Sequence, residues 1–133
     1  MKKMIFALFV ALALSACSSS KEQLDLKEAL MAKLKDDPDL KDYKLDPSDI
    51  ADCIVDNITD SLPGIMGDPR RPQFLEAYAK FVSVKSPKDA DAAAETYKDL
   101  FGSVQQAHEA GLGVTDYIMS CIGVAIEKRD GQG

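Results

Sequence analysis

The sequence predicts an all-α fold, a small bundle of four or five amphipathic helices. Two observations favour it. After residue 22, apolar residues recur mostly at three- and four-residue steps, which is the period of a helix with one buried face. Helix-start signals, in which a capping residue is followed by proline at the first helical position, occur at Asp46-Pro47 and Ser86-Pro87.

The first predicted helix covers residues 22–35, because Leu26, Leu30 and Leu34 recur at four-residue steps. The stripe is narrow, so this helix could either pack on the bundle or form a loose stalk. Residues 36–46 are acidic and interrupted by a proline. We expect a solvated loop or a short helical turn there.

The Asp46-Pro47 start predicts a second helix that ends near Leu62. Its aspartates fall on one face and its apolar residues on the other, as expected for a helix that covers a core. The predicted inner face holds Ile50, Cys53, Ile54, Asn57 and Ile58.

A third helix is predicted over residues 73–84, where Phe74, Tyr78 and Phe81 share one face. Three aromatic side chains suggest the centre of the core. A groove for a peptide or a lipid tail would give the same pattern.

The Ser86 start predicts a fourth helix over residues 87–110, with Gly111 as its C-terminal stop. Gly102, inside this range, would bend the helix or allow a close approach. A last helix is expected from residues 113–115 to about Lys128, with Cys121 on its inner face.

The first residues have the pattern of a secretory signal peptide. Lys2 and Lys3 are followed by the apolar run Met4 to Leu14, which holds 11 residues. This run is too short to cross a bilayer, since a spanning helix needs about 20 residues.

Leu14-Ser15-Ala16-Cys17 resembles the bacterial lipobox. The resemblance implies that Cys17 carries a diacylglycerol, that cleavage makes it the first residue, and that its new amine is open to acylation such as palmitate. The chain then divides into a signal peptide (1–16), a lipidated cysteine with its tether (17–22) and a helical domain (23–130). Since Ser18, not aspartate, follows Cys17, the resemblance favours the periplasmic face of the outer membrane; the inner membrane and the cell surface are alternatives.

Cys53 and Cys121 remain once Cys17 is used for the anchor. An even pair in an oxidising compartment predicts a disulfide. Both residues lie on predicted inner faces, so the bridge would join the second helix to the last. Two buried free thiols are the alternative.

The charge is acidic. Residues 1–16 hold two lysines and no acid, so their removal takes the net charge from −6 to −8. This balance argues against nucleic acid as a partner and against a polybasic attraction to anionic lipid. It suits a basic partner surface, or simply solubility.

The segment 62–72 is the least regular of the chain and carries four candidate partner-binding residues: Ile65, Met66, Arg70 and Arg71. One interpretation is a plain connector whose Ile65 and Met66 pack into the core, with Asp68 capping the next helix. The other is a partner-binding loop, because methionine adapts to irregular surfaces and arginine is favoured at interface centres.

The sequence holds little that indicates catalysis. His108 is the single histidine, and one histidine beside Glu109 does not make a metal site, because neighbours on a helix diverge. His108 could act as a base for a distant serine, but no nucleophile-elbow motif is present. We therefore expect no enzyme activity, no metal and no cofactor.

The predicted function is that of a non-enzymatic envelope lipoprotein, held in the membrane by the lipid on Cys17, that binds another envelope protein. In architecture alone the chain resembles secretin pilotins and other small helical assembly accessories, so the resemblance assigns no residues. The alternatives are an acidic inhibitor or immunity lipoprotein that blocks a basic enzyme, and a carrier of lipid or peptide.

Overall fold

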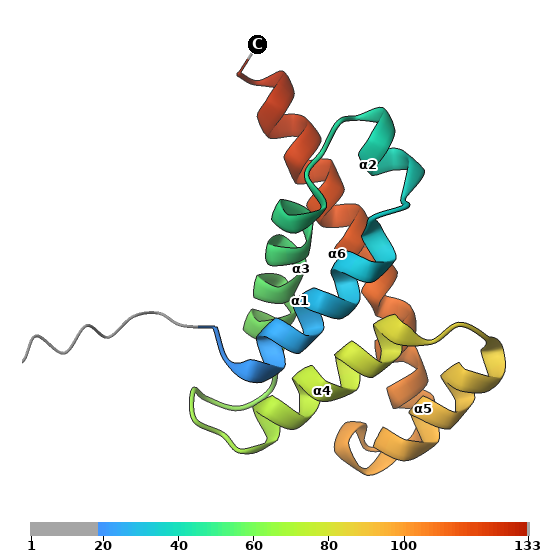
Figure 1. The fold of residues 1–133 in the computed structure, drawn as a ribbon. Helices are drawn as coiled ribbons and strands as arrows, with labels where there is room; N and C mark the ends of the chain where they lie inside the picture. The colour runs from blue at the N-terminus through green and yellow to red at the C-terminus, as the bar shows by residue number, and fades with distance from the viewer. Residues whose placement is uncertain (1–18, 133) are drawn as a thin grey trace, which may run out of the picture.

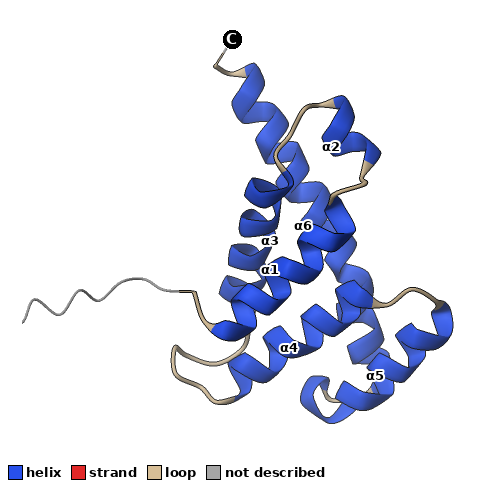
Figure 2. Ribbon diagram, viewed as in Figure 1, coloured by secondary structure: helices blue, strands red, loops and turns tan. Residues whose placement is uncertain are grey.

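The structure, a computed structural model, describes residues 19–132, which form six α-helices and no strand (Figure 1; Figure 2). The all-α prediction is confirmed. The helices are α1 (Lys21–Leu34), α2 (Pro38–Asp42), α3 (Pro47–Ser61), α4 (Arg70–Ser83), α5 (Pro87–Phe101) and α6 (Val104–Asp130).

The helix α1 is a packed part of the bundle and not a stalk. It lies against α3 and α4, and Leu26, Leu30 and Leu34 are at most 1% exposed. The four-residue step places all three on the face that meets these two helices. The long helix α6 contacts α3, α4 and α5, so the bundle closes around one core.

The acidic segment after α1 contains the short helix α2, one of the two outcomes expected for it. The Asp37 side chain caps it by accepting hydrogen bonds from the backbone N–H groups of Asp39 and Leu40, at 2.9 and 3.2 Å. Leu40 is buried. One apolar side chain is therefore enough to hold this polar segment on the bundle.

The predicted boundary between the last two helices is wrong. The expected helix over 87–110 ends at Phe101, because Gly102 adopts a φ of 105° and takes the left-handed C-cap. Ser103 then caps α6 by accepting a hydrogen bond from the Gln106 N–H at 3.1 Å. The last helix begins at Val104, not at residues 113–115.

Gly111, which was expected to stop a helix, lies inside α6. A Cβ at this position would be 3.4 Å from Cγ of Phe81, which is van der Waals contact. The backbone of α6 therefore passes directly over the Phe81 ring of α4.

The aromatic residues of α4 and α5 form the part of the core between α4, α5 and α6. Phe74, Tyr78 and Phe81 are less than 10% exposed, which confirms the core interpretation of this stripe. Phe101 of α5 lies edge-on to Phe74 and Tyr78, with ring centroids 5.0 and 6.0 Å apart. Burial raises the pKa of the Tyr78 hydroxyl to about 12.

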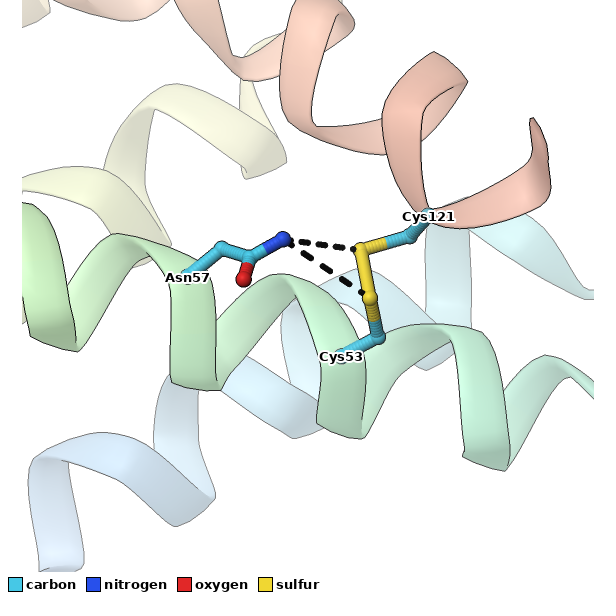
Figure 3. The surroundings of a disulfide bond; sticks show 3 residues. All are labelled: Cys53, Asn57 and Cys121. Carbon is cyan, nitrogen blue, oxygen red and sulfur yellow. Dashed lines mark hydrogen bonds between the residues drawn. A yellow bond between two sulfur atoms is a disulfide. The ribbon is translucent and has the colours of Figure 1, made fainter. Parts of the chain in front are cut away.

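A disulfide between Cys53 and Cys121 joins α3 to α6, as predicted (Figure 3). The two Cα atoms are 5.9 Å apart, although 68 residues separate them in the chain. The Asn57 amide, one turn after Cys53, points at the bridge and donates to Sγ of Cys121 at 3.3 Å. Cys121 is 1% exposed, so the bridge belongs to the core.

Cys53→Ser and Cys121→Ser should lower the free energy of unfolding by equal amounts, since each removes the same bridge. The chain-entropy model gives about 4 kcal/mol for a closed loop of this length. Chemical denaturation with and without a reductant measures the loss. The reductant should lower the free energy of unfolding of the wild type to that of the variants and leave the variants unchanged. Unequal losses in Cys53→Ser and Cys121→Ser would show that the serines act through packing.

Candidate functional site

The chain enters the bundle at the N-terminus of α1. Cys17, the predicted lipid-attachment residue, lies outside the described residues. Ser20 caps α1 by accepting from the Gln23 N–H at 3.2 Å, and the Gln23 side chain accepts from the Ser20 N–H at 2.9 Å. The predicted tether, 17–22, is therefore shorter than expected, because this capping box starts the helix at Lys21.

The start of α1 is bonded to the end of α3. The Gln23 amide donates to Oγ1 of Thr59 at 3.3 Å. Two residues after Thr59, α3 ends and the α3–α4 loop, residues 62–69, begins. Figure 1 shows this loop beside the blue start of α1. The entry point of the chain and the loop singled out by the sequence thus share one end of the bundle.

Ile65 and Met66 do not pack into the core. They are 81% and 86% exposed, the highest values among the large apolar side chains of the described residues. The interpretation of this loop as a plain connector with buried Ile65 and Met66 is wrong. Gly64 and Gly67, with φ of 85° and 90°, flank the pair and turn the backbone so that both side chains face outward.

Arg71 holds the loop on the bundle. Its guanidinium donates to three backbone carbonyls, those of Thr59 at 2.7 Å, Leu62 at 3.1 Å and Gly64 at 3.2 Å. The last carbonyls of a helix have no partner within the helix, so Arg71 supplies the missing donors at the end of α3. This structural use of Arg71 was not predicted, because it depends on α4 meeting the end of α3.

Arg70 is bound to Asp68 at the edge of the same loop. Its Nη2 lies 2.8 Å from Oδ2 of Asp68, and its backbone N–H donates to Oδ1 at 2.9 Å. These bonds lower the pKa of the Asp68 carboxyl to about 2. Asp68 was expected to cap this helix, α4, but the capping position is Pro69, which makes no side-chain cap; Asp68 instead accepts from the N–H of Arg70, the first residue of α4.

His108 links two helices. Its Nε2 lies 3.0 Å from Oδ1 of Asp91, so it joins α6 to α5 on the surface. No group of three or more His, Cys, Asp or Glu side chains within residues 19–132 is arranged to hold a metal ion. The partner of His108 is therefore the carboxylate of Asp91, which lies on the neighbouring helix.

The outward face of α6 was missed by the sequence analysis. Leu112 and Met119 are 69% and 67% exposed, and their seven-residue spacing puts them on one side of the helix. Gly123 continues this side, and a Cβ there would meet nothing within 4 Å. We call Leu112, Met119 and Gly123 the α6 outer face. The helix boundary that was wrongly predicted at Gly111 divided α6 in two, so the seven-residue spacing of Leu112 and Met119 was not recognised.

The α6 helix carries both buried and exposed apolar side chains. Among the described helices it alone has the length and composition to cross a membrane, with a mean hydropathy of 1.3 over 18 residues. Within that window only 17% of the residues are buried. Val114, Ile118, Cys121 and Ile122 of this helix are buried, and Tyr117 and Ile126 pack partly against the core. Its exposed large apolar side chains include Leu112, Met119 and Val124, of which Leu112 and Met119 share the α6 outer face.

Arg71→Ala should destabilise the protein by about 1–3 kcal/mol, because three carbonyls at the end of α3 lose a charged donor. Arg71→Lys should recover only part of this loss, since an ammonium cannot reproduce the fork of the guanidinium. Arg70→Ala, which removes the ion pair with Asp68 but leaves the three carbonyls paired with Arg71, is the matched control and should cost less. Equal effects of Arg70→Ala and Arg71→Ala in denaturation would contradict the capping role.

The Asp68 carboxyl should titrate near pH 2 in an NMR titration. Arg70→Ala should raise this pKa toward the ordinary 3.8, though not fully, because the backbone N–H of residue 70 still donates. Since the folded pKa is depressed, the pair stabilises the loop above pH 4, and this contribution is lost as the pH falls to about 2. An unchanged pKa in Arg70→Ala would mean that the side chain is not the cause.

Comparison with known proteins identifies the N-terminal segment alone. Residues 1–18 match the family model of the prokaryotic membrane lipoprotein lipid attachment site. No curated protein and no solved structure matches the chain. The match confirms the bacterial lipoprotein signal inferred from Leu14-Ser15-Ala16-Cys17, and the chain is a lipid-anchored envelope lipoprotein whose domain is assigned to no family.

Proposed function

We propose that this lipoprotein is a non-enzymatic binding module that holds a second envelope protein on the α6 outer face. The observation that carries the proposal is the exposure of Leu112 and Met119, 69% and 67%, on one side of this helix. Surface helices with unpaired apolar stripes commonly dock a partner helix. The proposal moves the partner site from the α3–α4 loop, where the sequence analysis expected it, to α6.

Gly123 supports the same surface. Glycine inside a helix costs about 1 kcal/mol relative to alanine, and no part of the described chain packs where its Cβ would be. The chain itself thus gives no packing reason for this glycine. A partner helix that packs across Met119 could approach the backbone closely at this point.

The covalent attachment of α6 to α3 supports the proposal further. The Cys53–Cys121 bridge holds the middle of α6 to α3, two residues from Met119. A partner would meet a preformed surface, so little conformational entropy is lost on binding.

The outward aspartates of α3 support a second candidate function, an inhibitor or immunity lipoprotein. Asp49, Asp52, Asp56 and Asp60 are exposed along one side. Asp52 is 2.7 Å from Nζ of Lys27, and within residues 19–132 the other three have no ion pair. A basic enzyme surface would match this row.

Met119→Glu should reduce the amount of partner captured from crosslinked, detergent-solubilised envelopes roughly tenfold or more, because a charge replaces an apolar contact. Leu24→Glu is the matched control, since Leu24 is also an exposed apolar residue, 55% exposed, but lies on α1. Mass spectrometry of the captured material gives the readout.

The other outcomes separate the alternatives. Loss of capture in Met66→Glu but not in Met119→Glu would return the partner site to the α3–α4 loop. Loss in high salt and in Asp56→Asn would favour the inhibitor. A bound lipid or peptide in place of a protein would favour a carrier.

A further inference from the structure

Ile65 and Met66 form one apolar tip at the end of the bundle. They are neighbours in the chain, and more than four-fifths of each side chain is exposed. Exposed apolar residues scattered singly are normal on protein surfaces, but two adjacent ones on a protruding loop make a contiguous patch.

The tip is held in place and is not a slack connector. The Asp68 N–H donates to the carbonyl of Ile65 at 3.0 Å and closes the turn. Arg71 holds the carbonyl of Gly64, the residue before the tip, at 3.2 Å. Since the turn is closed on itself and Arg71 of α4 holds its first side, the loop keeps Ile65 and Met66 exposed.

The lipid anchor joins the chain at this same end. Four residue steps separate Cys17 from Lys21, so the attached lipid lies within about 14 Å of the start of α1. The bond from Gln23 to Thr59 ties that start to the end of α3, and the α3–α4 loop begins three residues after Thr59. In Figure 1 the loop and the entry of the chain lie side by side.

We propose that Ile65 and Met66 contact the surface of the lipid bilayer that holds the Cys17 lipid, and thereby fix which end of the bundle faces the membrane. A short tether keeps this bilayer at a high effective concentration next to the tip. A lipid surface is therefore favoured over a protein as the occupant. The proposal rests on the lipid attachment and is independent of what α6 binds.

Apolar contact, and not charge, carries this interaction. Arg70 is neutralised by Asp68, and Lys21 pairs with Asp25 at 2.6 Å. The mature chain is acidic as a whole, so anionic headgroups repel most of its surface. An uncharged tip such as Ile65-Met66 can approach them without this cost.

The opposite end of α3 would then be held away from the membrane. There Arg129, near the end of α6, donates to the carbonyl of Tyr43, just before α3. A helix of 15 residues is about 22 Å long. In this orientation the end of α6 and the short helix α2 lie deeper in the aqueous space.

The chain contains no tryptophan, which allows a direct test with one fluorophore at a time. The lipidated full-length protein is reconstituted in phosphatidylethanolamine and phosphatidylglycerol vesicles, with or without brominated acyl chains. Met66→Trp reports on the tip. Met119→Trp is the matched control, because Met119 is also an exposed methionine but lies on α6. Circular dichroism checks that both variants keep the helical fold.

Met66→Trp should show a blue-shifted emission in vesicles and quenching by the brominated lipid, whereas Met119→Trp should keep its aqueous emission. The proposal is overturned if Met66→Trp stays in water, if both tryptophans respond alike, or if only Met119→Trp is quenched. Aqueous emission of Met66→Trp in vesicles that turns blue on adding an envelope extract would instead assign the tip to a protein.

Discussion

Two hydrogen bonds that meet at Thr59 connect the start of the described chain, the end of α3 and the start of α4. Gln23 donates to its hydroxyl oxygen and Arg71 to its carbonyl oxygen. The first bond ties the lipidated start of the chain to the end of α3, and the second ties α4 to the same point. Because the α3–α4 loop lies between Thr59 and Arg71, these two contacts add to the packing of Leu26, Leu30 and Leu34 in holding the loop beside the start of α1.

The two proposed surfaces can act at the same time, because they face different ways. Tyr117 of α6 lies 2.8 Å from Oγ of Ser61, the last residue of α3. Met119 follows two residues later, which is about 200° around a helix. It therefore points away from the end of α3 and from the loop, so a bilayer at the loop leaves the α6 outer face open to a protein.

Features set by local spacing were predicted from the sequence. The stripe from Leu26 to Leu34 predicted a buried helix, and the inward positions of Cys53 and Cys121 predicted their bridge. Gly102 was misjudged because glycine is compatible with a bend, a close approach and a C-cap, and only the φ of 105° decides between them. The local signal that favoured the end of a helix at Gly102 was Ser103, which is the capping residue of the next helix.

Features that require distant segments to meet could not be predicted. Arg71 was read as a partner-binding residue because no local pattern shows that the end of α3 lies beside it. The exposure of Ile65 and Met66 likewise depends on the path of the loop between two helices. Whether Ile65 and Met66 bind lipid or protein depends on where the lipid anchor lies relative to the loop, and the spacing of residues in the sequence does not reveal that position.

The bridge also depends on the chemistry of Cys17. A chain with three thiols can form three different intramolecular pairs, two of which would use residue 17. Once its sulfur is a lipid thioether, Cys17 has no thiolate to attack a disulfide. Exchange between cysteines within the chain is then excluded, and Cys53 has only Cys121 as a partner. When the lipid is attached before oxidation, Cys53–Cys121 is thus the one disulfide that the chain can form within itself.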